Sequence, residues 1–248
     1  MNTSNEACAM ILAAGLGTRL GDMTKAKPKA LVEINGRPLI EILMQNLKFQ
    51  GFTTVIVNTH HFANQLTDYL QTNTFGLKIY ISDERNCLMD TGGAIVQANR
   101  FFPSGSSVLV HNVDIISNID LKNIYDNFQL SGDDAWLVTQ DRISSRKILS
   151  DFNDLLCGWT NKSTKEFKWV NNSKKEKYNE LAFSGIHLFK KELFDGLPLR
   201  PSSVIDLYIK LAATKKIKCQ TAPCSYWFDL GKVNDLPRIE EHLKTIRL

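Results

Sequence analysis

Two glycines and two cationic side chains near the N-terminus are the first residues of this sequence whose types and spacing could do chemistry. Gly15 and Gly17 follow a short apolar run, Arg19 comes soon after them, and Lys29 follows further on. Glycines in such a turn let the backbone approach an anion closely, and successive backbone N–H groups form an anion-binding concavity. Two fixed cations beside that turn would neutralise phosphate charge. The pattern therefore predicts a triphosphate site.

Two familiar glycine loops do not fit this segment. A dinucleotide-binding fingerprint would need a third glycine where Leu20 stands, and a Walker loop would need a Gly-Lys-Ser/Thr run that is absent here. The remaining alternative is that Arg19 and Lys29 are solvated surface charges.

Two carboxylates follow apolar runs elsewhere in the chain. Asp114 comes directly after the run 107–113, and Asp229 lies in Trp227-Phe228-Asp229-Leu230-Gly231. Magnesium is bound in proteins by one or two carboxylates together with phosphate oxygens. The pair is therefore a candidate Mg²⁺ site, although an Asp after a strand more often begins a turn.

A second glycine pair begins a predicted helix. In Met89-Asp90-Thr91-Gly92-Gly93-Ala94 the small residues lead us to expect exposed N–H groups at the helix N-terminus, against which a base or ribose could lie. Ordinary helix capping by Asp90 or Thr91 is the alternative.

The elements that must position these residues alternate regularly through about residue 140. Apolar runs at 7–13, 53–58, 77–81, 107–113 and 135–139 are typical of strands, and amphipathic segments lie at 38–49, 62–70, 92–101 and 121–128. Alternation of this kind predicts an α/β fold with a doubly wound, mostly parallel sheet. Ligands of such sheets bind at the carboxyl ends of the strands, where the candidate residues fall.

The pattern changes after residue 141. A polar stretch with two tryptophans, about 141–180, predicts a small β-rich flap or hairpin. Regular signals return with a strand at 181–189, a helix at 202–213, strands near Ile217 and Tyr226, and a final helix at 233–246. We expect one domain, 1–248, with a core at 1–140, the flap at about 141–180 and a C-terminal part at 181–248 that contains the candidate metal ligand Asp229.

Composition narrows the classes of function. The chain has 248 residues, of which 43% are hydrophobic and 23% charged, as in globular proteins. A net charge of +4 suits anionic small molecules and argues against a nucleic-acid partner. Five scattered cysteines without a Cys-x-x-Cys pair argue against disulfides and zinc. No signal or membrane segment is evident, so we expect a cytoplasmic protein without a membrane partner, and a homo-oligomer is compatible with the sequence.

The glycine segment carries a family resemblance. Ala13-Ala14-Gly15-x-Gly17-Thr18-Arg19-Leu20, followed by Lys27-Pro28-Lys29-x-Leu31-Val32, resembles the signature of sugar-1-phosphate nucleotidyltransferases. The resemblance implies a Rossmann-like nucleotidyltransferase fold and transfer of a nucleoside monophosphate from an NTP to a sugar 1-phosphate, with release of pyrophosphate. It implies a nucleotide site formed by Leu12, Ala13, Ala14, Gly15, Gly17, Thr18, Arg19, Lys29, Asp90, Thr91, Gly92, Gly93 and Asn112.

The resemblance also implies roles for single residues. Arg19 would stabilise the departing pyrophosphate and Lys29 would contact phosphate, while Asp114 and Asp229 would hold Mg²⁺. Ala30 stands where the family usually has a second proline, and Val113 where relatives place glycine.

The resemblance implies that the sugar side of the site lies on two other segments, one of them in the C-terminal part 181–248, which would then bind both sugar and metal. Asn58 is a candidate sugar contact, and the segment Phe183-Ser184-Gly185-Ile186 resembles the family's sugar-binding strand, in which Ser184 and Gly185 would approach the sugar. His60 and His61 are expected to be structural, because a sugar phosphate is already an ionised nucleophile and needs no general base.

Within the family, the likeness is greatest to N-acetylmuramate-1-phosphate uridylyltransferases of peptidoglycan recycling. UTP is the favoured nucleotide, and a mannose- or heptose-1-phosphate guanylyltransferase using GTP is the alternative. Two other classes stay open: a glycosyltransferase that uses Asn112-Val113-Asp114 as a metal-binding motif, and a nucleotide-binding subunit without turnover.

Overall fold

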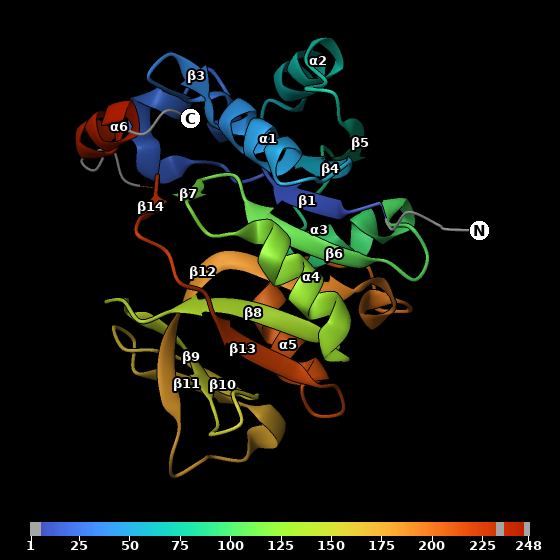
Figure 1. The fold of residues 1–248 in the computed structure, drawn as a ribbon, viewed down its shortest axis with the longest axis vertical. Coiled ribbons are helices and arrows are strands. Elements are labelled where there is room, and N and C mark those ends of the chain that lie inside the picture. Colours follow the sequence, from blue (N-terminus) through green and yellow to red (C-terminus); the bar gives the residue numbers. More distant parts are fainter. Residues whose placement is uncertain (1–5, 232–235, 246–248) are drawn as a thin grey trace. The chain divides into compact units, whose positions relative to one another are not determined.

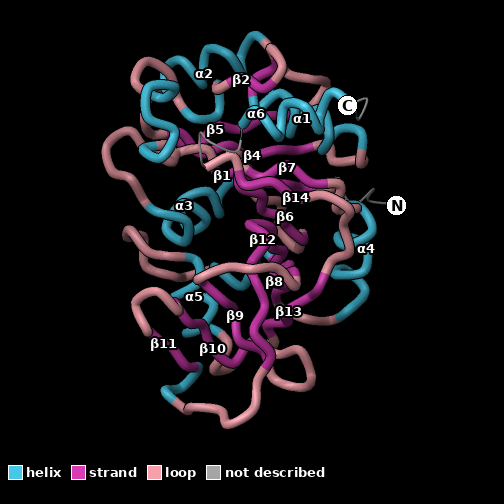
Figure 2. Tube along the Cα trace, turned by 90° about the vertical axis from the view of Figure 1, so that its left-hand side faces the viewer, coloured by secondary structure: helices cyan, strands magenta, loops and turns pink. Residues whose placement is uncertain are grey.

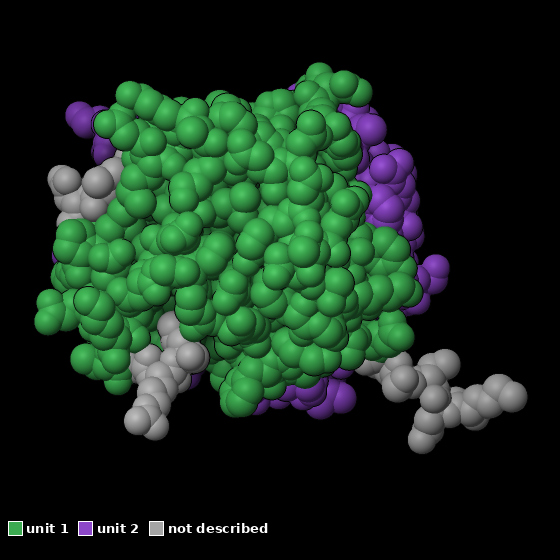
Figure 3. Space-filling view, turned by 90° about the horizontal axis from the view of Figure 1, so that it is seen from above, with its two compact units in different colours: residues 1–88, 111–121, 224–248 green, residues 89–110, 122–223 purple. Residues whose placement is uncertain are grey.

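The chain divides into two compact units, each assembled from separate stretches of sequence. The computed structural model describes residues 6–231 and 236–245. Unit 1 comprises residues 1–88, 111–121 and 224–248, and unit 2 comprises residues 89–110 and 122–223 (Figure 3). Among the described residues, no helix has the length and apolar character needed to cross a membrane.

Unit 1 is built on a parallel sheet of three strands. Strand β4 pairs in parallel with β1 on one side and with β5 on the other, and helices lie beside these strands (Figure 2). The elements of the unit are β1 (Cys8–Leu12), η1 (Thr18–Thr24), η2 (Lys29–Leu31), β2 (Glu33–Ile34), β3 (Arg37–Pro38), α1 (Leu39–Phe49), β4 (Thr54–Thr59), α2 (Ala63–Thr72), β5 (Lys78–Asp83), β7 (Ile115–Ser117), β14 (Trp227–Asp229) and α6 (Leu236–Thr245).

The first helix shows why the sequence folds this way. Leu39, Ile40, Leu43 and Leu47 recur at helical spacing and are buried, so one face of α1 packs inside the unit. Pro38 precedes the helix, where its fixed φ angle is compatible with the first turn.

Unit 2 combines one parallel pair with several antiparallel pairs. Strand β8 is parallel to β13 and antiparallel to β12, and β12, β9, β10 and β11 follow one another in antiparallel order (Figure 1). The elements are α3 (Asp90–Ala98), η3 (Asn99–Phe101), β8 (Ala135–Gln140), β9 (Arg146–Ser150), β10 (Leu156–Asn161), β11 (Glu166–Trp169), η4 (Val170–Asn172), β12 (Asn179–Lys190), η5 (Lys191–Phe194), α5 (Val204–Leu211) and β13 (Ile217–Thr221). Two elements, β6 (Ser107–Asn112) and α4 (Leu121–Ser131), run across the sequence boundary of the units.

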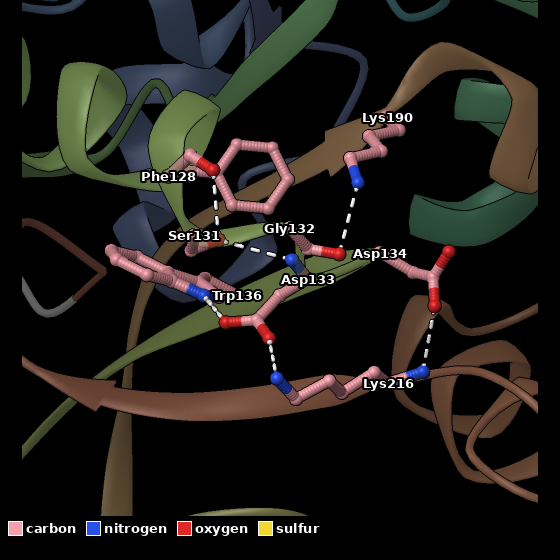
Figure 4. Close-up of polar contacts among 8 residues, drawn as sticks. All are labelled: Phe128, Ser131, Gly132, Asp133, Asp134, Trp136, Lys190 and Lys216. Carbon is pink, nitrogen blue, oxygen red and sulfur yellow. Dashed lines mark hydrogen bonds and ion pairs between the residues drawn. The ribbon is translucent and has the colours of Figure 1, made fainter.

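A polar network fastens the start of β8 to β13 (Figure 4). Asp133 accepts a hydrogen bond from Trp136 Nε1 at 2.6 Å and forms an ion pair with Lys216 at 2.7 Å. Burial raises the pKa of the Asp133 carboxyl, but the hydrogen bonds from Lys216 and Trp136 outweigh it and hold that pKa below its ordinary value. Asp134 accepts the backbone N–H of Lys216 at 2.7 Å, so two adjacent carboxylates fix the register of the parallel pair.

The predicted fold class is confirmed: the chain is α/β, and its helices and strands alternate as expected. The predicted β hairpin after residue 141 is confirmed as the antiparallel pair β10 and β11. The final helix is described only as Leu236–Thr245, so residues 233–235 and 246 of the predicted helix lie outside the described part of the chain. The division into a core, a flap and a C-terminal part stays a prediction.

Candidate active site

The glycine loop follows β1 in unit 1, and its two glycines have different surroundings. Gly17 has a φ angle of +67°, and a Cβ atom there would lie 2.8 Å from Thr24 Cγ2. That position therefore requires glycine for both its conformation and its packing. Among the described residues other than its two chain neighbours, no heavy atom lies within 4 Å of the Cβ position of Gly15, and this residue is exposed. The loop is thus held at Gly17 and open at Gly15.

The predicted cation Arg19 belongs to the 3-10 helix η1 that follows Gly17. Its side chain lies outside the described part of the structure, so its role stays a prediction. The backbone around it is anchored, because Leu20 N donates to Gly17 O at 2.8 Å and the Thr24 hydroxyl donates to Gly17 O at 3.1 Å. Thr18 is exposed beside them.

A buried amide holds the start of this loop against the sheet. Asn58 at the end of β4 accepts the backbone N–H of Ala13 at 2.7 Å, and its amide nitrogen donates to Glu84 Oε1 at 2.8 Å. Asn58 and Glu84 are 3% and 2% exposed. Asn58, predicted to contact sugar, therefore braces the loop in this structure, and its contact with a sugar stays a prediction.

Glu84 is a residue that sequence reasoning missed. Its carboxylate binds Asn58, and its carbonyl oxygen lies 2.8 Å from His60 Nδ1, so it organises two residues of the preceding strand end. The sequence did contain a signal. Glu84 comes shortly after the predicted strand 77–81, at the end where the candidate residue Asn58 follows the neighbouring strand. His60 is tied to backbone, as expected for a structural histidine.

The cation Lys29 and the carboxylate Asp114 lie together in unit 1. Lys29 Nζ forms an ion pair with Asp114 Oδ2, and the two side chains are only 8% and 16% exposed. A charged pair so far removed from water interacts more strongly than a surface pair, and loss of one partner leaves an uncompensated charge. The predicted phosphate contact and the predicted metal ligand are therefore neighbours.

The second predicted metal ligand, Asp229, is brought near Asp114 by the pairing of two short strands. Strand β14 pairs with β7 so that Asp229 lies opposite Ile115, and Leu230 N donates to Asp114 O at 2.8 Å. Asp229 Oδ1 also accepts the N–H of Gly231 at 2.8 Å, which orients its carboxylate. The two predicted metal ligands are thus brought together on adjoining segments.

The donor set suits a hard divalent cation. Among residues 6–231 and 236–245, no group of three or more His, Cys, Asp or Glu side chains is arranged to hold a metal by itself. Two carboxylates that need phosphate oxygens to complete the coordination are what Mg²⁺ commonly uses. The residues therefore fit a metal that binds together with a phosphate ligand.

The strand that leads to Asp114 contributes no further positive charge. His111 is buried, and burial lowers its pKa to about 4, against the opposing effects of its hydrogen bond to Asn112 and the Asp114 charge. It is therefore neutral near pH 7. Asn112, predicted to contact nucleotide, follows it at the end of β6, and Val113 N binds Leu12 O at 3.1 Å.

The second glycine pair is packed rather than open, which corrects one expectation. The N–H groups of Gly92 and Gly93 are not exposed; they donate to Ser202 O at 2.7 and 3.2 Å. A Cβ atom would lie 2.7 Å from Leu207 Cδ1 at Gly92 and 2.5 Å from Arg200 O at Gly93. Glycine is required at these positions because another segment of unit 2 lies against them.

The two residues before that glycine pair, Asp90 and Thr91, also make hydrogen bonds within unit 2. The Thr91 hydroxyl accepts the N–H of Val204 at 2.9 Å, and Asp90 has a φ angle of +56° with its carboxylate accepting the Thr91 N–H at 2.6 Å. An aspartate is one of the few residues that tolerate a left-handed backbone. The part of these residues in nucleotide binding stays a prediction.

The predicted sugar-binding residues lie within β12 at an irregularity. Gly185 has a φ angle of +81°, and the pairing of β12 with β8 shifts register between Phe183 and His187. Ser184 is buried, and its hydroxyl accepts the N–H of Ile186 at 3.2 Å. Of the predicted site residues, Ala13, Ala14, Lys29, Asn58, Asp114 and Asp229 belong to unit 1, and Asp90 to Gly93, Ser184 and Gly185 belong to unit 2.

Known proteins resemble this chain over nearly its whole length. An N-acetylmuramate alpha-1-phosphate uridylyltransferase of Caulobacter vibrioides is 32% identical over 227 residues, covering 90% of this chain and 91% of that protein. A D-glycero-alpha-D-manno-heptose 1-phosphate guanylyltransferase of Campylobacter jejuni is 28% identical, covering 92% of this chain and 96% of that protein.

Solved structures share the fold. HddC from Yersinia pseudotuberculosis, complexed with GMP-PN, has a TM-score of 0.75 at 24% identity and covers 96% of this chain and 99% of its own. A putative glucose-1-phosphate thymidylyltransferase from Bacillus anthracis has a TM-score of 0.79 at 18% identity and covers 98% and 97%. A family model described as nucleotidyl transferase matches residues 8–147. The chain therefore belongs to the nucleotidyl transferase family.

Proposed function

We propose that this enzyme transfers a uridylyl group from UTP to N-acetylmuramate 1-phosphate and releases pyrophosphate. The observation that carries the reaction class is the buried pair of Lys29 and Asp114 with Asp229 on the adjoining strand. The choice of UTP and of this sugar is supported by the 32% identity to the uridylyltransferase of Caulobacter vibrioides across 90% of the chain.

The reaction needs the negative charge of the NTP phosphates and of the leaving pyrophosphate to be offset. An oxygen of the sugar phosphate attacks the α-phosphorus of the NTP in line; a new P–O bond forms as the bond to the leaving pyrophosphate breaks. Lys29 and Arg19 neutralise the phosphates, and the open backbone at Gly15 approaches them closely. When the nucleotide binds, Lys29 exchanges its ion pair with Asp114 for a contact with phosphate, and the Asp114 carboxylate becomes available to a metal ion.

Nucleotidyl transferases generally use a divalent metal ion, and Mg²⁺ is our proposal for this chain. Asp114 and Asp229 would hold it, and the bound ion would offset charge on the phosphate oxygens. We place the enzyme in the cytoplasm, in keeping with the free thiols of its five cysteines. Its small net charge of +4 and the sugar 1-phosphates named for its relatives support a reaction without a nucleic-acid or membrane partner. A homo-oligomer remains compatible with this proposal.

A guanylyltransferase acting on mannose or heptose 1-phosphate is the second candidate. The heptose enzyme of Campylobacter jejuni, 28% identical with 96% of its length covered, favours it. The same phosphate machinery serves either base, so the two candidates differ only in base and sugar.

Pyrophosphate release tests both candidates in one experiment. The enzyme is assayed with Mg²⁺ and either UTP or GTP against N-acetylmuramate, N-acetylglucosamine, mannose, glucose and heptose 1-phosphates. We expect release with UTP and N-acetylmuramate 1-phosphate. Release only with GTP and mannose or heptose 1-phosphate would replace the first candidate with the second. Nucleotide binding without pyrophosphate release from any acceptor would favour a glycosyltransferase or a subunit without turnover.

A further inference from the structure

A cleft in unit 2 is lined by an unusual number of cations. It has a volume of about 340 Å³ and lies among β9, β10, β11, β12 and the start of α5. Its charged lining residues are Arg142, Arg146, Lys147, Lys168 and Asp206. Four cationic side chains and one carboxylate therefore face one small space, which we call the basic insert pocket.

The single carboxylate of the pocket is already paired. The Asp206 carboxylate accepts a hydrogen bond from Lys168 Nζ at 2.7 Å. This bond is the main reason why the pKa of Lys168 is raised. Lys168 Nζ also lies 5.2 Å from the ring centroid of Trp159, which fixes it over the indole. The lining also holds the cations Arg142, Arg146 and Lys147 and no carboxylate besides Asp206, so its net charge is positive and the pocket favours an anionic ligand.

Two of these three cations are held in place by backbone carbonyl groups. Arg142 donates to Phe183 O at 2.8 Å, and Lys147 donates to Arg142 O at 2.7 Å. The Arg146 guanidinium makes no hydrogen bond or ion pair with the described residues, and it is exposed at the rim. A guanidinium is well suited to bind a carboxylate with two parallel hydrogen bonds.

The pocket is adjacent in sequence to the predicted sugar-binding residues. Phe183 lines it, and Ser184 and Gly185 follow on the same strand, β12. Trp159 and Phe183 give the pocket apolar surface in addition to its charge. A ligand that combines a sugar ring with an acidic substituent matches both properties.

We propose that the basic insert pocket binds a carboxylate of the acceptor, so that the enzyme selects acid-bearing sugar 1-phosphates over their neutral counterparts. The inference rests on the proposed function, because it assigns a second binding site for the same acceptor. N-acetylmuramate 1-phosphate carries such a carboxylate on its lactyl ether, and N-acetylglucosamine 1-phosphate is the same sugar without it.

The test compares acceptors that differ by one carboxylate. Values of kcat/KM are measured for N-acetylmuramate against N-acetylglucosamine 1-phosphate, and for glucuronate against glucose 1-phosphate, with whichever NTP supports turnover. We expect an acid-to-neutral ratio above one in at least one pair. Arg146→Gln should lower that ratio about ten-fold, because a charge-assisted hydrogen bond to the ligand is lost. The ratio should also fall as salt is raised.

A matched control lies in the turn between β10 and β11. Lys162→Gln makes the same change of charge, but Lys162 lies outside the pocket and pairs with Glu180, and the acid-to-neutral ratio should stay at its wild-type value. Equilibrium binding of N-acetylmuramate and N-acetylglucosamine 1-phosphates by calorimetry gives a second readout that needs no turnover. Tighter binding of the acidic member, weakened by Arg146→Gln, supports the proposal even if another NTP or sugar is the true substrate.

Two outcomes would overturn the proposal that the basic insert pocket binds a carboxylate of the acceptor. An acid-to-neutral ratio at or below one in both the kinetic and the binding experiments removes the proposed selection, whether or not the uridylyltransferase reaction is found. An equal loss for acidic and neutral acceptors in Arg146→Gln would assign the pocket to a group that all acceptors share.

Discussion

The two glycine segments look alike in the sequence but differ in what surrounds them. Apart from its chain neighbours, no part of the chain that the structure describes lies within 4 Å of the Cβ position of Gly15 in unit 1, whereas a Cβ atom at Gly93 of unit 2 would lie 2.5 Å from Arg200 O. The first glycine leaves room for a ligand, and the second lets two segments of the same unit pack closely. Paired glycines in a sequence therefore do not by themselves distinguish binding from packing.

The buried polar groups of the two units show the same contrast. In unit 1, Lys29 and Asp114 meet where the resemblance predicts phosphate and metal. In unit 2, Asp133 joins Trp136 and Lys216, and its contacts hold strands together (Figure 4). One set is proposed to exchange partners when a ligand binds, and the other has no part in the proposed reaction.

The largest effect is expected from the charges of unit 1. Asp114→Asn should lower kcat by about a thousand-fold, because a metal ligand contributes several kcal/mol to the stabilisation of the transition state. It should also lower the free energy of unfolding, since Lys29 is left buried without its partner. Pyrophosphate release and urea unfolding measure the two effects.

A double variant separates these two roles of Asp114. Lys29→Met combined with Asp114→Asn removes both charges, so stability should recover relative to Asp114→Asn alone while activity stays low. Recovery of activity in the double variant would show that Asp114 serves the ion pair and not the reaction.

The next effect concerns packing in unit 2. Gly93→Ala should lower the free energy of unfolding by about 2 to 3 kcal/mol, because the added methyl group must displace the backbone at Arg200. Urea unfolding followed by circular dichroism measures the change. A variant as stable as the wild type would remove the distinction between the two glycine segments.

A pH effect of intermediate size tests whether His187 is shielded from water in the interior of unit 2. Burial lowers the pKa of His187 from 6.5 to about 3, so between these pH values the unfolded chain binds a proton that the folded chain does not. Stability should therefore fall as the pH falls below 6.5, by up to about 1.4 kcal/mol per pH unit from this group. His187→Gln should reduce that slope in unfolding experiments from pH 7 to pH 5.

Tyr208→Phe is the control for this effect. The Tyr208 hydroxyl lies 2.6 Å from His187 Nδ1, and its removal leaves the burial of the histidine in place. The variant should be less stable than the wild type at every pH and should keep the wild-type slope. A slope unchanged by His187→Gln would contradict burial as the cause.

The smallest effect is expected at the open glycine. Gly15→Ala should leave the free energy of unfolding within about 0.5 kcal/mol of wild type, as for a residue without packing contacts. It should raise the KM for NTP by about ten-fold if the backbone here approaches phosphate closely. A large loss of stability with an unchanged KM would make Gly15 resemble Gly93.

Features set by local pattern could be predicted from the sequence. The helical spacing of Leu39, Leu43 and Leu47 predicted α1, and the end of the apolar run 107–113 predicted a carboxylate, Asp114, at the sheet edge, whereas Asp229 was assigned as its partner through the family resemblance. The role of Glu84 and the burial of Gly92 could not be predicted, because each depends on a partner far away in the sequence, Asn58 and Ser202 respectively. Contacts between segments that are far apart in the chain produce no recognisable pattern in the local sequence.

The place of β11 has a consequence for the evolution of the enzyme. In the order β11, β10, β9, β12 it is the outermost strand, paired on one side only, and it carries the charged residues Glu166 and Lys168. Charges on an edge strand discourage pairing with another chain, which protects the protein from aggregation. Because β8, β12 and β13 pair without β11, and because Lys168 of β11 lines the basic insert pocket, substitutions on this strand can change the pocket while the inner strands keep their pairing.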